Sequence, residues 1–197
     1  VEAVRDHYLP IGLDSNVPKK PYSIALSLTD KIDTLIGFFG VNEKPSGSKD
    51  PYALRRLALG IVRIIIENKK NFKINDLISY SSNIYLEQGF NFSNSSLQKD
   101  ISLFLKDRFK FYLKDKDIRA DIINASTKVL NLNEISNVYE KAKSLNKIIT
   151  KSIGEDIVAS YKRASNILNS EITDPDKQLS NSTDPGIFKN IYEKNLY

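Results

Sequence analysis

The chain has 197 residues, enough for one large domain or two small ones with a buried core, and its net charge is +5 at pH 7. Cysteine is absent, which excludes disulfides and thiolate metal sites and fits a cytoplasmic protein. The apolar run "ALGIVRIIIE" is short and contains an arginine, so no membrane-spanning helix is expected. The basic excess suits an anionic partner, but it also suits an ordinary lysine-rich composition.

Apolar residues recur at helical spacing along almost the whole chain, which predicts an all-α fold. A short helix opens the chain at "VEAVRDHYLP", and a turn containing Pro10, Gly12, Pro18 and Pro21 follows it. Further helices are expected over residues 22–39, 51–67, 74–88, 97–114, 118–129, 134–150 and 155–169. The turn-rich stretch "EITDPDKQLSNSTDPG" then precedes a last fragment, "IFKNIYEKNLY".

The polar stretches between Asn68 and Ser96 predict a boundary between two helical units, which we place after residue 75. Methionine is absent and the first residue lies inside an expected helix. The chain is therefore expected to be a piece of a longer protein.

Two carboxylates, Asp30 and Asp33, share one helix face with Gly37 in the segment "LSLTDKIDTLIGFF". Such a face either forms ion pairs or carries metal or acid–base chemistry. The single histidine, His7, leaves too few ligands for a catalytic divalent metal, so we expect neither a metal nor a catalytic residue. Phosphate-binding loops, glycine fingerprints and nucleophile–histidine pairs are absent from the sequence.

The segment "SGSKDPYALRR" places a small-residue turn and two adjacent arginines before a very apolar helix. Asp50 can cap that helix, and Pro51 suits its first turn because a missing N–H costs nothing there. Arg56 and Arg63 share a helix face, and Arg55 lies about a hundred degrees around the helix. These arginines either pair with the carboxylate face of the preceding helix or contact RNA phosphates.

Basic residues alternate with aromatic ones in "LKDRFKFYLKDKDIR", a pattern that suits single-stranded RNA but also an amphipathic helix with a buried aromatic face. The segment "SYKRASNIL" offers a polar helix face, either an ordinary surface or one that reads RNA. The candidate RNA-binding residues are Arg55, Arg56, Arg63, Lys106, Arg108, Lys110, Lys162, Arg163 and Asn166.

Three segments together resemble one family: "DHYLPIGLDSNVP", "LTDKIDTLIGFFGVNEKPSGSKDPYALRRLALGIVRII" and "SYKRASNIL". The family is the beta subunit of the bacterial tetrameric glycyl-tRNA synthetase. Its signature reads approximately A-D-K-L-D-T-L-x-G-F-F and then P-T-G-S-K-D-P-F-A-L-R-R. Thr29, Ser46 and Tyr52 replace the signature's alanine, threonine and phenylalanine. The match is dense over residues 1–68 and weaker from 103 to 168.

The resemblance implies an internal-to-C-terminal fragment of that subunit. Residues 1–75 would be the C-terminal part of an HD-like helical domain, with Asp30 at the position of the last metal ligand in metal-binding HD proteins. Residues 76–197 would be a C-terminally incomplete helical bundle, similar to the anticodon-binding domain of arginyl-tRNA synthetase.

The resemblance also implies the function. The chain would bind glycine tRNA in support of glycine–tRNA ligation in the cytoplasm and be inactive alone. Glycine activation with ATP and Mg would belong to the alpha subunit, so this fragment would hold no cofactor. Its partners would be glycine tRNA and the alpha subunit, within a beta–beta or alpha–beta assembly and without a membrane. Two alternatives stay open: a metal-dependent HD-type phosphohydrolase remnant, and a scaffold that docks the alpha subunit.

Overall fold

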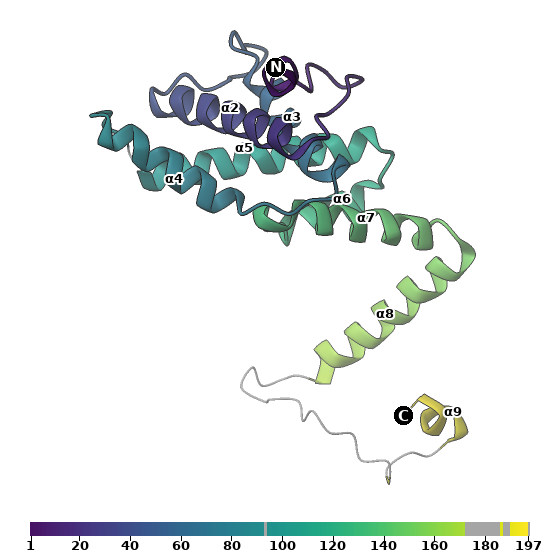
Figure 1. Cartoon of the computed structure of the whole chain (residues 1–197). Helices are drawn as coiled ribbons and strands as arrows, with labels where there is room; N and C mark the ends of the chain where they lie inside the picture. Colours follow the sequence, from purple (N-terminus) through teal and green to yellow (C-terminus); the bar gives the residue numbers. More distant parts are fainter. Residues whose placement is uncertain (93, 172–185, 187–189, 197) are drawn as a thin grey trace. The chain divides into compact units, whose positions relative to one another are not determined.

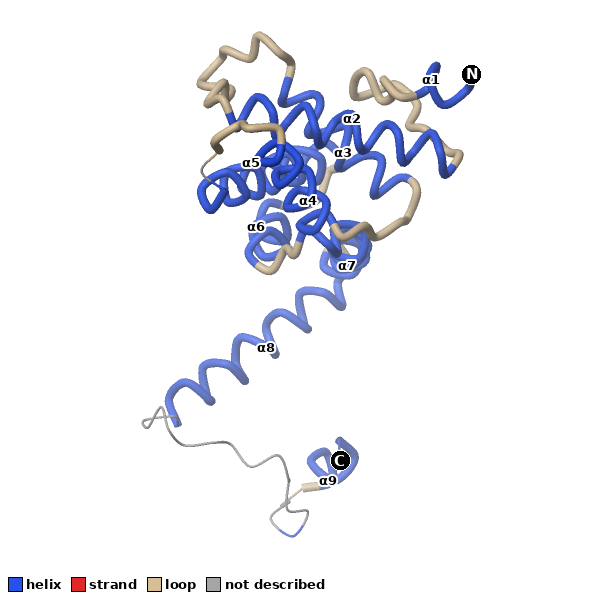
Figure 2. Tube along the Cα trace, turned by 60° about the vertical axis from the view of Figure 1, so that its left-hand side comes forward, coloured by secondary structure: helices blue, strands red, loops and turns tan. Residues whose placement is uncertain are grey.

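The computed structural model describes residues 1–92, 94–171, 186 and 190–196, and the regular elements among them are all helices (Figures 1 and 2). The all-α prediction is therefore confirmed. The helices are α1 (Glu2–Asp6), α2 (Pro21–Gly40), α3 (Leu54–Glu67), α4 (Ile74–Glu87), α5 (Asn94–Asp115), α6 (Ala120–Lys128), the short 3₁₀ helix η1 (Leu132–Glu134), α7 (Ile135–Ile149), α8 (Ser152–Glu171) and α9 (Ile191–Leu196).

The chain forms two compact units, residues 1–148 and residues 149–197. The first contains α1 to α7, and the second contains α8 and α9. The turns predicted at residues 172–185 lie outside the described residues. Within the first unit α4 packs against both α2 and α5, so helices on either side of residue 75 share one core. The expected division of the chain into family domains at that residue stays a prediction.

Helix α3 is the centre of the first unit and packs against α2 and α5 (Figure 2). Every residue from 58 to 66 is buried, so this helix is covered on all sides. A helix with an apolar surface all round needs such cover. Because α3 is enclosed, the residues at its N-terminal end are fixed relative to α2 and α5.

A segment without regular structure, residues 7–20, is held onto α2 by buried polar side chains. The Lys31 ammonium donates hydrogen bonds to the carbonyls of His7 (3.0 Å) and Tyr8 (3.3 Å). The Ser27 hydroxyl donates to the carbonyl of Leu9 (2.7 Å). Gly60 of α3 leaves the room that Lys31 needs, since a Cβ there would lie 3.1 Å from the lysine Cε. These contacts satisfy backbone groups that the segment cannot satisfy itself.

The start of α3 confirms the predicted cap and corrects the predicted boundary. Asp50 accepts hydrogen bonds from the backbone N–H groups of Leu54 (2.8 Å) and Arg55 (3.0 Å), as a capping carboxylate should. The helix begins at Leu54 rather than at Pro51. Residues 50–53 instead close a turn, with the N–H of Ala53 donating to the Asp50 carbonyl (3.1 Å), and this turn brings the carboxylate over the helix end.

Among the described residues, none of the helices combines the length and the apolar character needed to cross a lipid bilayer.

The two neighbouring phenylalanines of α5 have opposite environments: Phe109 is 0% exposed and Phe111 is 42% exposed. We expect Phe109→Ala to lower the free energy of unfolding by about 3–5 kcal/mol, because it empties a filled core position. Phe111→Ala, the matched control, should cost less than about 1 kcal/mol. Urea denaturation of both variants measures the difference. Equal losses would contradict the packing described for α5.

Candidate nucleic-acid interface

Arg55 closes the small-residue turn that precedes α3. Its guanidinium donates to the carbonyls of Gly47 (2.7 Å) and Lys49 (3.4 Å). The turn itself is held by reciprocal backbone hydrogen bonds between Ser46 and Lys49, and Gly47 has a positive φ of 52° that suits glycine. The segment "SGSKDPYALRR" is therefore a folded unit in which Asp50 and Arg55 fix the helix entrance.

Arg56 points elsewhere. Its side chain is exposed, and no hydrogen bond or ion pair within the described part of the chain uses its guanidinium. It lies instead at the edge of two surface hollows. An exposed arginine without an acidic partner keeps its donors free for an anion. Of the adjacent pair, Arg55 stabilises the loop and Arg56 is available to a ligand.

Arg63 is only 6% exposed, and its guanidinium is committed to the protein. It forms an ion pair with Glu67 (2.7 Å) one turn further along α3. It also donates to the carbonyl of Ser15 (2.7 Å) and to that of Gly12. These bonds hold residues 12–15 against the helix, so we leave Arg63 out of the proposed interface.

The expected pairing of arginines with the carboxylates of α2 is not found among the described residues. Asp33 instead accepts hydrogen bonds from the hydroxyls of Ser81 and Tyr85 on α4, each at 3.3 Å. Gly37 makes this possible, because a Cβ there would lie 2.9 Å from the Tyr85 hydroxyl oxygen. The carboxylate face of α2 is thus closely approached by α4.

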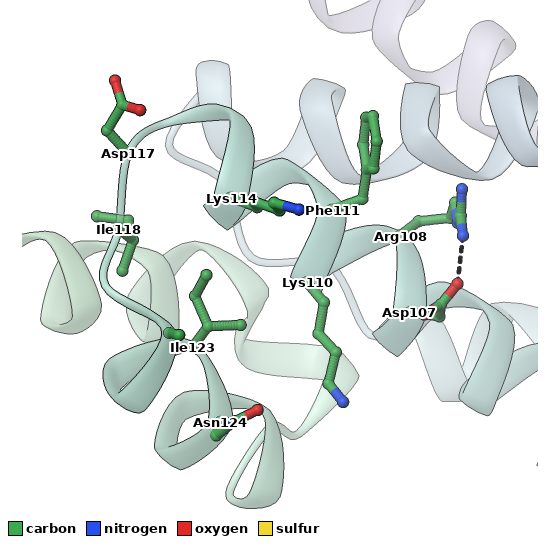
Figure 3. Close-up of a pocket in the computed structure, with 10 residues that line it drawn as sticks. Asp107, Arg108, Lys110, Phe111, Lys114, Asp117, Ile118, Ile123 and Asn124 are labelled. Atoms are coloured by element: carbon green, nitrogen blue, oxygen red, sulfur yellow. Dashed lines mark hydrogen bonds and ion pairs between the residues drawn. The ribbon is translucent and has the colours of Figure 1, made fainter.

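A hollow of about 690 Å³ lies between α5 and α6 (Figure 3). Arg108, Lys110 and Lys114 line it together with Phe111, whose ring leaves α5 on the side opposite to Lys110. Asn124 of α6 lines the same hollow. Among the described residues, no ion pair involves Lys110 or Lys114.

A second hollow, of about 270 Å³, joins α5 to the start of α3. Arg55, Arg56, Arg108 and Phe111 all line it, and because Arg108 and Phe111 also line the larger hollow, the two adjoin. We call the surface formed by these residues the basic face. It consists of Arg55, Arg56, Arg108, Lys110, Lys114 and Phe111.

Arg108 is the residue of the basic face whose side chain makes both an ion pair and aromatic contacts. Its guanidinium pairs with Asp107 and lies 5.9 Å from the ring centre of Phe104 and 5.7 Å from that of Phe111. Its Nε is buried without a hydrogen-bond partner. The two aromatic rings attract the cation and so restrain its position. Asp107 offsets part of its charge, so the lysines and Arg56 carry most of the free positive charge.

The other predicted candidates do not line the two hollows of the basic face. Lys106 is half-buried on α5 and lines neither hollow. Lys162, Arg163 and Asn166 are exposed on α8, in the second unit. Lys114 is not among the residues predicted from the sequence, although it lies four residues after Lys110 and so shares its helix face.

In the described part of the chain, Asp30 belongs to no cluster of possible metal ligands. Within the part of the chain that the structure describes, no group of three or more histidine, cysteine, aspartate or glutamate side chains gathers around a possible metal position. The residues present therefore do not fit a catalytic divalent metal site of the kind that HD proteins carry. The expectation that the chain holds no metal stays a prediction.

The comparison with known proteins identifies the family. The profile of the family described as glycyl-tRNA synthetase beta subunit matches residues 1–128. The chain is similar to the glycine–tRNA ligase beta subunit of Rickettsia canadensis, with 42% identity over 199 residues that cover 99% of the chain. The identity to the same subunit of Rickettsia prowazekii is 41% over 196 residues and 100% of the chain. The chain belongs to the glycyl-tRNA synthetase beta subunit family, and it spans 27% of the length of these relatives.

The contrast between Arg63 and Arg56 gives a stability test. Arg63→Ala should lower the free energy of unfolding by about 2–4 kcal/mol, because it leaves Glu67 and two carbonyls without their partner. Arg56→Ala, on the same helix, should change it by no more than about 0.5 kcal/mol. Urea denaturation measures both. Equal urea midpoints for the Arg63→Ala and Arg56→Ala variants would show that Arg63 does not hold residues 12–15 as described.

Proposed function

We propose that this chain is a tRNA-binding part of a glycine–tRNA ligase beta subunit. The family supports a role in glycyl-tRNA synthesis, and the basic face supports contact with an RNA. Under this proposal the chain has no chemistry of its own and works in the cytoplasm. An alpha subunit binds ATP and Mg and activates glycine, while this chain binds the glycine tRNA within the assembly of the two subunits.

The observation that carries the proposal is the meeting of two helices at one exposed aromatic ring. Phe111 lines both hollows of the basic face. It shares one with Arg56 of α3 and the other with Lys110 and Lys114 of α5. The exposed cations suit phosphates, whose contacts release counterions and make binding depend on salt. The exposed ring suits an unstacked base. The Arg108 guanidinium lies beside that ring, 5.7 Å from its centre.

The buried parts of the same helices give the face its rigidity. Phe109 and Leu113 of α5 are 0% exposed, and α3 is enclosed along most of its length. Because these residues anchor the two helices in one core, the cations on their outer sides keep a fixed spacing. A fixed pattern of cations loses less conformational entropy on binding than a mobile one does.

Salt dependence of RNA binding tests the basic face. Arg56→Ala and Lys110→Ala should each weaken binding to glycine tRNA and reduce the slope of log K against log salt by about 1. Lys70→Ala is the matched control, since Lys70 is exposed and follows the other end of α3, which lies roughly 16 Å along the helix axis from Arg56. Filter binding at several salt concentrations measures the slopes. Unchanged slopes in both variants would refute RNA binding at this face.

Helix α8 favours a second contact, because it exposes two different faces. Ile153, Ile157, Tyr161 and Leu168 recur at helical spacing and are all exposed. Lys162, Arg163 and Asn166 lie on the opposite side of the helix, by its 100° rotation per residue. We propose that the polar face contacts tRNA and that the apolar face docks the alpha subunit.

Two variants, each with several substitutions, test the two faces of α8 separately. The polar-face variant Lys162→Ala/Arg163→Ala/Asn166→Ala should lower tRNA affinity and retain the alpha subunit. The apolar-face variant Ile157→Ala/Tyr161→Ala should lose the alpha subunit in a pull-down and keep its tRNA affinity. Each variant is the other's control. Identical behaviour of the two would contradict a division of labour on α8.

A further inference from the structure

A third hollow, of about 440 Å³, lies between the N-terminal segment, α2 and the start of α3. Two tyrosines, Tyr8 and Tyr52, line it together with Asp30, Thr34 and Arg56. We call it the tyrosine pocket. Its size is within the range of small-ligand sites, and its mixture of apolar walls with a few polar groups is typical of them.

The two tyrosine rings are exposed but anchored. Tyr8 is 67% exposed, and its ring centre lies 3.9 Å from that of His7 with the planes inclined by 38°. Tyr52 is 47% exposed, while its ring stacks on Phe38 with centres 4.2 Å apart and planes inclined by 27°. Exposed aromatic rings whose positions are fixed are the surfaces on which unstacked bases lie in RNA-binding proteins.

Asp30 supplies a free acceptor. No hydrogen bond within the described residues uses its carboxylate, although its backbone carbonyl accepts one from the Thr34 hydroxyl (2.7 Å). The adjacent Lys31 directs its hydrogen bonds to His7, Tyr8 and Ser27 rather than to Asp30. Burial lowers the pKa of Lys31, and the Asp30 carboxylate acts in the opposite direction. A free carboxylate selects a base that carries an amino group, such as the N4 amine of cytosine.

Arg56 connects this pocket to the basic face, because it lines both the tyrosine pocket and the hollow shared with Arg108. Its guanidinium can meet a phosphate of a strand that follows the basic face. The next base of that strand can then turn away from the basic face toward the tyrosines.

We propose that the tyrosine pocket binds a single unstacked nucleobase that carries an exocyclic amino group, with Asp30 as the acceptor and the two tyrosines as stacking surfaces. This inference rests on the proposed function, since it names a nucleotide subsite of the same RNA-binding surface. It requires no covalent step.

Cytidine and uridine monophosphates test the inference, because their bases share a ring and differ at the amino position. In an NMR titration of the whole chain, CMP should bind about tenfold more tightly than UMP. Ribose 5-phosphate, which lacks a base, should bind more weakly than either. Asp30→Ala should abolish the preference for CMP. Equal affinities for CMP and ribose 5-phosphate would overturn the inference.

Tyr8→Ala should weaken CMP binding at least about threefold through the loss of stacking. Tyr80→Ala is its matched control, because Tyr80 is 69% exposed on α4 and lies outside the pocket. Thermal melts of both variants show whether the fold is retained. Equal CMP affinity in the two variants would exclude Tyr8 as a stacking surface and overturn the inference.

The two proposals fail separately. If Lys110→Ala lowers the salt slope of tRNA binding while CMP and UMP bind alike, the proposed function stands and the base pocket is wrong. If CMP binds selectively while the salt slope is unchanged in Arg56→Ala and Lys110→Ala, the pocket stands and the basic face is wrong.

Discussion

Two buried cations, Lys31 of α2 and Arg63 of α3, hold the irregular N-terminal segment onto the helical core. Their partners are backbone carbonyls of residues 7, 8, 12 and 15, which have no helix or sheet to satisfy them. A buried carbonyl without a partner costs about 1–3 kcal/mol, so the cations make this packing possible. The segment then supplies Tyr8 to the tyrosine pocket and Gly12 to the adjoining hollow.

The same residue types serve different purposes according to burial. Arg63 stabilises a loop from inside, Arg55 closes a turn, and Arg56 faces outward with free donors. On α5, Phe109 fills the core and Phe111 lies at the surface beside Arg108. Under the proposed function the outward members of each group contact RNA, while the buried members fix the positions of the outward ones.

Helical spacing was sufficient to predict the fold class and the order of the helices. The aspartate ahead of the apolar helix also predicted the Asp50 cap, because a capping residue acts on N–H groups a few positions away in the sequence. It could not predict the partners of Arg63 or Asp33, which come from residues 12–15 and from α4. Those contacts join segments that are distant in the sequence.

The candidate site was predictable in its parts but not in its assembly. The basic and aromatic pattern of α5 suits either RNA or a buried aromatic face, and the arginine pair at the start of α3 suits either a phosphate or a carboxylate. Only the packing of α3 against α5 shows that both patterns meet at Arg108 and Phe111. The residues of the tyrosine pocket come from three separate segments, so no local sequence motif predicts the pocket.

The central claim is that the basic face contacts tRNA. Lysine footprinting with and without glycine tRNA tests it most directly, because the method reports on individual lysine side chains in the protein without any substitution. The account predicts that Lys110 and Lys114 lose reactivity toward an amine-specific reagent when tRNA is bound, while Lys70 and Lys73 keep theirs. Undiminished reactivity of Lys110 and Lys114 in the complex would contradict it.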